Sequence, residues 1–210
     1  MSVRITGGRL RGRTIAVPAG QDLRPTAAIV REALFSMIGQ HLDGWRVVDL
    51  FGGSGLMAIE AASRGADPVI VVERDPRVAR ELRRSADSLG LNLDVRPLDA
   101  RRFTATAGEP IDLVFMDPPY KDDPEGWLKV GAALAPRWLV LEHRTGARLP
   151  AAVGGLVQDR LKTYGGSSLI IYRPRPQPRV EEAERVAQDQ GVVEDDGQAA
   201  RPDPALRHQA

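Results

Sequence analysis

The chain has 210 residues, of which 42% are hydrophobic, 27% charged and 5% aromatic, and this length and composition predict one globular domain with room for a short additional segment. The sequence contains no cysteine, which excludes disulfides, thiolate zinc sites, iron–sulfur clusters and cysteine nucleophiles. The net charge is only +1, but Arg residues gather at the beginning of the chain and acidic residues near its end.

The first segment, residues 1–44, combines a basic arm with a helix. Residues 3–17 place short apolar and basic stretches around Gly7 and Gly8, which predicts a hairpin-like arm. Apolar residues then recur at helical spacing between Thr26 and Gly39. A basic segment indicates a polyanionic partner, although a run of charge can also be a solvated face. The candidate phosphate contacts are Arg4, Arg9, Arg11, Arg13 and Arg24.

Residues 45–173 alternate short strands rich in Val and Ile with helical stretches. This alternation is typical of an α/β fold, a Rossmann-like, doubly wound parallel sheet. We expect strands near 46–50, 69–73, 93–96, 111–116, 138–142, 157–163 and 168–173, and helices near 55–64, 76–89 and 123–134. The last two strands are joined through Gly165 and Gly166 without room for a helix, so they should form an antiparallel hairpin.

Residues 174–210 differ in composition from the rest of the chain. This segment has five Arg, eight acidic residues and no aromatic residue. It cannot bury enough apolar surface to order itself, so we predict a disordered charged tail. A short helix over residues 180–189, formed on a partner, is the alternative.

A glycine-rich loop, Phe51–Gly55, follows the first strand of the sheet and precedes a helix. Glycines let the backbone approach a ligand closely, and the helix start offers unpaired N–H groups, which predicts a nucleotide-type site. The spacing of Gly53, Gly55 and Ala58 also fits the fingerprint of an NAD-binding oxidoreductase. Asp49 at the strand end would repel a pyrophosphate, whereas it suits the ammonium and sulfonium of S-adenosylmethionine.

Acidic residues also follow the second and third strands. Glu73 is placed to accept hydrogen bonds from both hydroxyls of a ribose, and Asp99 with Ala100 to meet an adenine. Asp99 could instead cap a helix before Arg101. For Asp75 we favour that capping role, since Pro76 follows it at the first helical position.

The motif Asp117-Pro118-Pro119-Tyr120 follows the apolar strand 111–116. Two prolines can simply enforce an extended exit from a strand. That explanation leaves the carboxylate and the aromatic ring unused. The lone pair of an exocyclic amine is conjugated into its base, so an enzyme that methylates it must accept its N–H bonds. Asp117 and the Pro118 carbonyl are two such acceptors, and Tyr120 could stack on a flipped base.

The order DLFGGSG, VVERD, LDA and DPPY resembles class I S-adenosylmethionine-dependent methyltransferases of exocyclic amines. With RITGGRLRGR, LRPT and VREALF, residues 4–173 resemble the RsmD family, which methylates guanine N2 in 16S ribosomal RNA. The resemblance implies a seven-stranded sheet with a terminal antiparallel hairpin. It implies cofactor contacts at Asp49, Gly53, Gly55, Glu73 and Asp99, to which we add the adjoining Phe51, Arg74 and Ala100. It also implies catalysis by Asp117, Pro118, Pro119 and Tyr120.

Other functions are possible on the same motifs. An adenine-N6 or cytosine-N4 amino-methyltransferase of DNA or RNA shares the Asp117–Tyr120 motif, but a DNA enzyme usually needs a target-recognition domain for which the chain has no space. A ribosome assembly factor with a vestigial site is disfavoured by the intact Asp49, Glu73 and Asp117.

The expected partner is 16S rRNA or an assembling small ribosomal subunit. No apolar run approaches the roughly 20 residues of a membrane span and no signal peptide is visible, so we expect a soluble cytoplasmic protein, and a monomer. We expect no metal, because His41, His143 and His208 are isolated and should be surface or satisfied side chains.

Overall fold

The structure is a computed structural model, and it describes residues 2–16, 26–105, 109–134 and 136–176. Contacts divide the chain into two units, residues 1–175 and 176–210, and nearly all of the described residues belong to the first. Arg24 and residues 177–210 of the expected tail lie outside the described residues. The proposed boundary between residues 44 and 45 stays a prediction.

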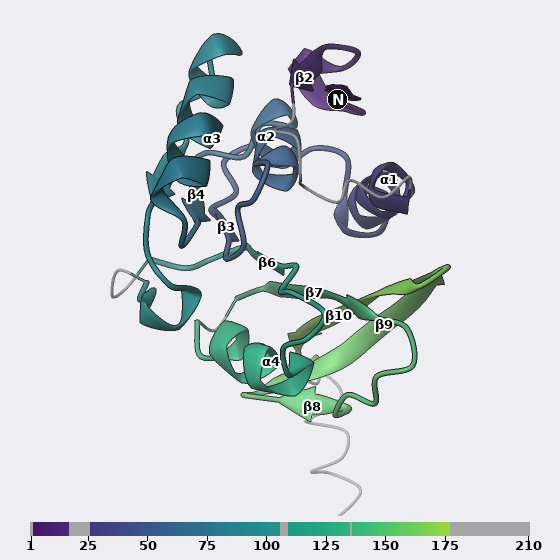
Figure 1. Cartoon of the computed structure of the whole chain (residues 1–210). Coiled ribbons are helices and arrows are strands. Elements are labelled where there is room, and N and C mark those ends of the chain that lie inside the picture. The colour runs from purple at the N-terminus through teal and green to yellow at the C-terminus, as the bar shows by residue number, and fades with distance from the viewer. Residues whose placement is uncertain (1, 17–25, 106–108, 135, 177–210) are drawn as a thin grey trace, which may run out of the picture. The chain divides into compact units, whose positions relative to one another are not determined.

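An eight-stranded sheet runs through the described part of this unit in the order β5-β4-β3-β6-β7-β10-β9-β8 (Figure 1). The strands are β3 (Val47–Asp49), β4 (Val69–Val72), β5 (Asp94–Arg96), β6 (Leu113–Met116), β7 (Trp138–Arg144), β8 (Ala152–Val153), β9 (Leu156–Tyr164) and β10 (Ser167–Pro174). The first five in spatial order are parallel, and β10, β9 and β8 pair antiparallel. The Rossmann-like sheet and the terminal hairpin are confirmed. The two-residue β8 is an addition to the seven predicted strands, too short to leave a periodic signal.

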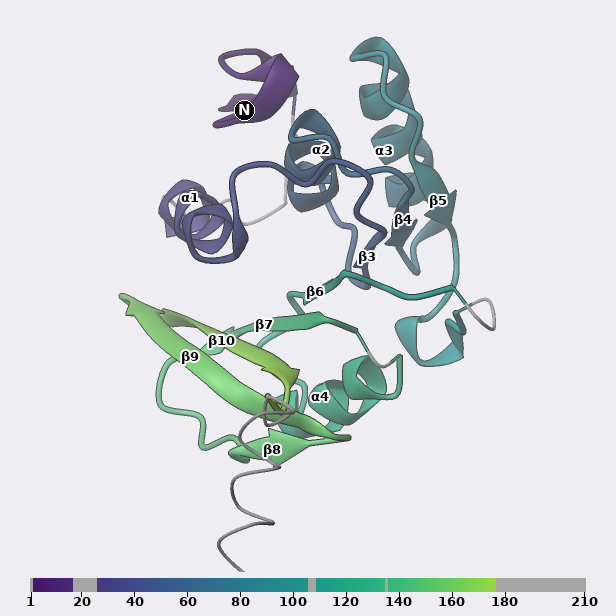
Figure 2. The ribbon, with the colours of Figure 1, turned by 180° about the vertical axis from the view of Figure 1, so that it is seen from behind.

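Helices cover both faces of the sheet (Figures 1 and 2). The helices α1 (Thr26–Ile38), α2 (Leu56–Ser63) and α3 (Pro76–Ser88) pack on one face, and α4 (Pro124–Ala132) with the short 3-10 helix η2 (Ala100–Arg102) on the other. Neighbouring strand residues such as Val47 and Val48 therefore enter opposite halves of the core. Burial on both faces explains why these strands are continuous apolar runs rather than alternating ones.

The basic arm is a two-stranded antiparallel sheet of β1 (Ser2–Arg4) and β2 (Thr14–Ala16), with the 3-10 helix η1 (Gly8–Leu10) between them. This confirms the predicted hairpin. The buried apolar side chains of the arm join a small core with two residues of α2, Leu56 and Ile59. The arm thus covers the helix that begins at the glycine-rich loop.

Within the described ranges, no helix is both long and apolar enough to cross a membrane.

Candidate active site

The glycine-rich loop occupies the carboxyl end of β3, where the sheet edge is open. Gly52 N–H donates to the Val72 carbonyl over 2.8 Å, and Gly55 N–H donates to the Gly52 carbonyl over 2.7 Å. Gly53 and Gly55 have φ angles of +48° and +75°, a region that side chains disfavour. A Cβ at Gly55 would also lie 2.7 Å from Leu82, so α3 approaches this loop too closely for any other residue.

Glu73 faces the glycine-rich loop from the end of β4. Its Oε2 accepts a hydrogen bond from Gly53 N–H at 2.9 Å, and its Oε1 accepts one from Asp75 N–H at 2.8 Å. Both bonds fix the orientation of the carboxylate. A carboxylate has about four acceptor positions, so each oxygen can still accept a hydrogen bond from a ligand.

Two acidic residues cap helices at the same edge. Asp75 Oδ1 accepts from Arg77 N–H at 2.8 Å at the start of α3, which confirms its predicted capping role. Asp99 Oδ1 accepts from Arg101 N–H at 2.8 Å and caps η2. Asp99 therefore has the capping role that the sequence analysis gave as the alternative to ligand binding. Asp99 also lines the large cleft at this edge.

A cleft of about 660 Å³ opens between these strand ends. From the predicted cofactor set it contains Phe51, Gly53, Glu73, Arg74, Asp99 and Ala100, and from the predicted catalytic motif Asp117 and Pro119. Five carboxylates line the cleft against two guanidinium groups: Glu73, Asp75, Asp99, Asp117 and Asp122 against Arg74 and Arg101. This excess of negative charge favours a ligand that carries positive charge and no phosphate.

Asp49 and Gly55 do not line the cleft wall. Asp49 is only 1% exposed, below the loop, where its Oδ1 accepts from Phe51 N–H at 3.1 Å. Burial raises the pKa of Asp49 to about 7, a rise that the bond from Phe51 opposes and the charge of Glu73 reinforces. The structure therefore shows Asp49 supporting the loop, and its direct contact with a cofactor stays a prediction.

The cleft has an aromatic wall of Phe51, which the sequence analysis named, and Trp127, which it missed. Phe51 and Trp127 meet edge to face with ring centroids 4.7 Å apart, and the Arg101 guanidinium lies 4.0 Å above the Trp127 ring. Trp127 also donates from Nε1 to Asp122 Oδ2 at 3.3 Å. No local signal marks this tryptophan as a site residue, because it resembles an ordinary buried position of α4.

The Asp117–Tyr120 motif separates two cavities. Asp117 and Pro119 line the large cleft, whereas Pro118, Pro119 and Tyr120 line a second hollow of about 250 Å³. The end of β7 contributes the other wall of the second hollow, including His143 and Arg144. Because β6 and β7 are parallel neighbours, their carboxyl ends lie side by side.

His143 corrects our expectation of a surface or satisfied histidine. It is 4% exposed, and its Nδ1 lies 2.9 Å from the Arg144 carbonyl, but its Nε2 has no hydrogen-bond partner among the described residues. Burial lowers its pKa, against opposing effects of the Arg144 carbonyl and Glu142. No cluster of three or more metal-ligating side chains occurs in the described part of the chain.

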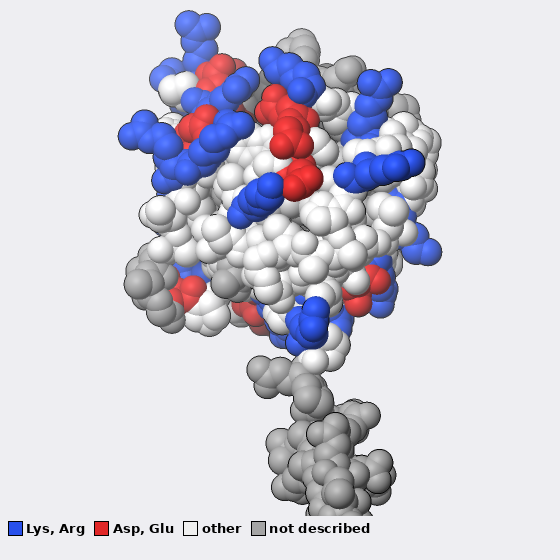
Figure 3. Space-filling model, turned by 90° about the horizontal axis from the view of Figure 1, so that it is seen from below, with Lys and Arg blue, Asp and Glu red and all other residues white. Residues whose placement is uncertain are grey.

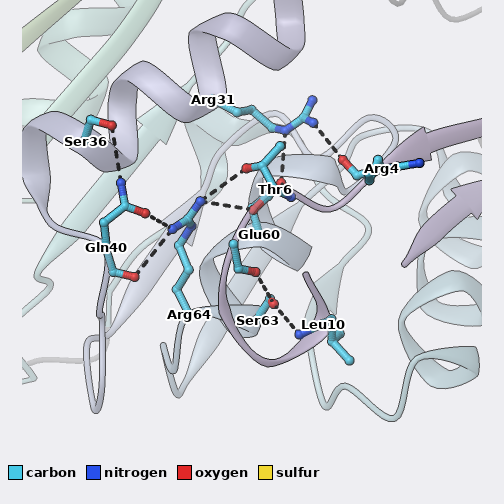
Figure 4. Close-up of polar contacts among 10 residues, drawn as sticks. Arg4, Thr6, Leu10, Arg31, Ser36, Gln40, Glu60, Ser63 and Arg64 are labelled. Atoms are coloured by element: carbon cyan, nitrogen blue, oxygen red, sulfur yellow. Dashed lines mark hydrogen bonds and ion pairs between the residues drawn. The ribbon is translucent and has the colours of Figure 1, made fainter. Parts of the chain in front are cut away.

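The arm is anchored to α2 by buried charges (Figure 4). Glu60, which is 0% exposed, forms ion pairs with Arg31 at 3.4 Å and Arg64 at 3.5 Å. Glu60 Oε1 also accepts from Thr6 N–H at 2.6 Å. A Cβ at Gly7 would lie 2.2 Å from the Arg64 guanidinium, so the glycine pair of the arm permits this close approach.

Four of the predicted phosphate contacts are on the arm and are exposed: Arg4, Arg9, Arg11 and Arg13. Arg9 Nη2 donates to the Gly90 carbonyl at 3.2 Å. Seen from below, the molecule shows Lys and Arg mixed with Asp and Glu around a broad uncharged surface (Figure 3). On that face, the described Lys and Arg residues do not form a continuous basic surface.

Comparison with known proteins gives consistent matches. Residues 3–173 match the family described as Conserved hypothetical protein 95. The Bacillus subtilis protein YlbH, named as an rRNA methyltransferase, is 36% identical over 82% of this chain and 100% of that protein. The Ribosomal RNA small subunit methyltransferase D of Escherichia coli is 38% identical over 57% of this chain and 61% of that enzyme, less than two thirds of its length. The solved structure of YhhF from Escherichia coli, described as a methyltransferase, has a TM-score of 0.69 at 30% identity and covers 84% of this chain and 100% of its own.

Proposed function

The chain belongs to the family described as Conserved hypothetical protein 95, the RsmD family, and we propose that it methylates the exocyclic N2 amine of a guanine in 16S ribosomal RNA. It is an rRNA methyltransferase, and its methyl donor is S-adenosylmethionine. The observation that carries the proposal is the division of Asp117–Tyr120 between two adjoining cavities. A group-transfer enzyme must hold donor and acceptor next to each other, and this motif borders both spaces.

The residues of the large cleft fit S-adenosylmethionine. Its carboxylates suit the ammonium and sulfonium groups, and the same carboxylates would repel the pyrophosphate of NAD. Glu73, already oriented by two backbone N–H groups, would accept the ribose hydroxyls. Asp99 would accept the exocyclic amine of adenine, and the Phe51 ring would add apolar contact. When bound, the cofactor supplies a methyl group on a positively charged sulfur.

Asp117 and Pro118 would prepare the amine for reaction. The carboxylate of Asp117 and the carbonyl of Pro118 accept the two N–H bonds of the amine, which favours a pyramidal nitrogen with an available lone pair. The carboxylate also stabilises the positive charge that develops on that nitrogen. This interaction is stronger in the transition state than in the ground state, so it raises the rate rather than the affinity.

Tyr120 would hold the target base in the second hollow. It is half-buried there, beside Pro118 and Pro119. Prolines have no N–H in this segment to compete for the acceptors, and an aromatic ring stacks on a base that has left its helix. Stacking of this kind contributes about 1–3 kcal/mol per base.

The basic arm would bind the phosphate groups of the RNA. Its exposed Arg side chains suit phosphate groups, while Glu60 and its partners hold the inner side of the arm against α2. Arg24, which lies outside the described residues, would make the same kind of phosphate contact. We further propose that the enzyme acts as a cytoplasmic monomer on 16S rRNA or on an assembling small subunit, with residues 1–44 as RNA-binding segment and 45–173 as catalytic domain.

Mass mapping of modified nucleotides tests this function. In 16S rRNA from a strain that lacks the protein, one N2-methylguanine should disappear. The wild-type gene should restore it and the Asp117→Ala gene should not. Loss of a methyl group from adenine or cytosine instead, or restoration by Asp117→Ala, would refute the proposal.

A further inference from the structure

One exposed cation lines the second hollow, two more directly follow residues that line it, and the proposed reaction uses none of the three. Arg144, at the end of β7, lines the hollow and is exposed. Lys121 follows Tyr120, and Arg148 follows Ala147, two residues that also line it. Both of these cations are exposed as well. We name Lys121, Arg144 and Arg148 the hollow rim.

None of the three rim cations has an ion-pair partner among the described residues, where eight ion pairs occur elsewhere. Lys129 on the nearby helix α4 provides the contrast, since its Nζ lies 2.9 Å from Glu125 Oε1. An exposed cation without a partner keeps its charge available to a ligand. A cation that already forms an ion pair gains less from binding a phosphate.

Two acids line the hollow, and each accepts a hydrogen bond from a side chain of the protein. Asp122 and Glu142 line it but are half-buried. Asp122 accepts from Trp127 Nε1, and Glu142 accepts from Ser167 Oγ. One oxygen of each acid is thus engaged by the protein, and neither acid forms an ion pair with a rim cation among the described residues, so an anion can meet the rim without breaking an ion pair.

The backbone beneath the rim is held in place by His143. A carbonyl oxygen only accepts, so the 2.9 Å contact means that His143 Nδ1–H donates to the Arg144 carbonyl. This bond fixes the strand end from which Arg144 extends. Arg144 is therefore attached to the sheet, whereas Lys121 and Arg148 lie in the segments that follow β6 and β7.

We propose that the hollow rim binds the phosphates that flank the target nucleotide, as a second RNA-binding surface besides the arm. This inference rests on the proposed function, which places the target base in the hollow. A nucleotide whose base enters there brings its two flanking phosphates to the edge of the hollow. Phosphate contacts of this kind position the strand and carry no base specificity.

The salt dependence of RNA binding tests the proposal. Binding of the full-length protein to a protein-free 16S rRNA transcript is measured over a range of KCl concentrations. Each lost phosphate contact should lower the slope of log affinity against log salt by about 0.7 to 0.9. The triple variant Lys121→Ala, Arg144→Ala, Arg148→Ala removes three contacts and should therefore lose about 2.1 to 2.7 from the slope.

Two variants serve as matched controls. Lys129→Ala removes a paired cation from the same region and should leave the slope at the wild-type value. Arg144→Lys keeps a positive charge and should retain the slope that Arg144→Ala loses. Melting temperatures of all variants check folding, and because the three rim side chains are exposed we expect them to match the wild type.

The outcomes separate this inference from the proposed function. An unchanged slope in the triple variant, or an equal loss in Lys129→Ala, overturns the rim as a phosphate site even if the wild type methylates guanine N2. Absence of guanine methylation by the wild type refutes the proposed function on its own. If the triple variant fails to fold, the single variants Arg144→Ala and Arg144→Lys decide by the difference between their slopes.

Discussion

The protein uses charge in opposite ways at the arm anchor and in the large cleft. At the anchor, Glu60, Arg31 and Arg64 are 0%, 3% and 4% exposed, and their charges are paired with one another. In the cleft, carboxylates outnumber guanidinium groups and lie within reach of solvent. The charges of the anchor stabilise the fold by pairing with one another, whereas the carboxylates of the cleft remain available to a ligand.

The two regions share helix α2, which connects them. Its first turn follows the glycine-rich loop, and its last turn carries Glu60 and Ser63 under the arm, with Arg64 directly after it. A change at the anchor should therefore affect stability, and a change in the cleft should affect binding or rate.

Glu60→Gln should destabilise the protein by about 3–5 kcal/mol, because it removes the carboxylate that pairs with two buried guanidinium groups. Urea unfolding measures the loss. The control is Glu125→Gln, which breaks the exposed pair with Lys129 and should have little effect. A Glu60→Gln protein as stable as the wild type would show that the anchor charges are dispensable.

Asp117→Ala should lower the single-turnover methylation rate by roughly 10²-fold or more, while the affinity for S-adenosylmethionine stays within about threefold. In the proposed mechanism the carboxylate acts on the amine and not on the cofactor. Asp123→Ala is the control, since Asp123 caps α4 close to the motif and should lose stability but keep the rate. Near wild-type methylation by Asp117→Ala would remove the assigned catalytic role.

Glu73→Ala should weaken binding of S-adenosylmethionine by about 1.5–3 kcal/mol, because the ribose loses its acceptors. The substitution also releases the N–H groups of Gly53 and Asp75, so the loop loses two internal bonds. Titration calorimetry measures the affinity. Unchanged binding in this variant would contradict the place given to Glu73.

Asp49 should make the stability of the cofactor-free protein depend on pH. Its folded pKa of about 7 lies above its ordinary value of 3.8, so the folded state binds the proton more tightly. This contribution is fully present below about pH 4 and is lost as the pH rises to about 7, with a slope of at most about 1.4 kcal/mol per pH unit. Asp49→Asn should remove the slope.

Urea unfolding of both proteins between pH 4.5 and pH 7.5 checks this prediction, with the difference between them as the quantity of interest. The depressed pKa of His143 acts in the opposite direction, but it is common to both proteins and cancels in the difference. Parallel stability curves would show that Asp49 is already ionised in the free protein.

Arg9→Ala, Arg11→Ala and Arg13→Ala should each lower the salt slope of RNA binding by about 0.7 to 0.9 for a lost phosphate contact. Point variants are the proper test here, because the arm covers Leu56 and Ile59 of α2 and its deletion would uncover them. A wild-type slope in all three variants would mean that the arm only covers α2 and makes no phosphate contact.

Several features were predictable because they depend on short stretches of chain. The alternation of apolar runs with helical spacing indicated the doubly wound sheet, and Gly165 with Gly166 indicated the final hairpin. The positions of Glu73 and Asp117 followed from one rule, that parallel strands end at one edge of a sheet. Asp75 was correctly predicted as a cap because its signal, the following Pro76, is local.

Other features were decided only by the tertiary structure, because they join residues far apart in the chain. Glu60 resembled an ordinary helix residue until Arg31, twenty-nine positions earlier, was placed beside it. His143 and Trp127 likewise gave no local signal, and Asp49 proved to lie beneath the cleft rather than in its wall. Residue type and spacing determine which strand ends carry chemistry, whereas long-range packing determines which charges are buried, which are paired and which face a ligand.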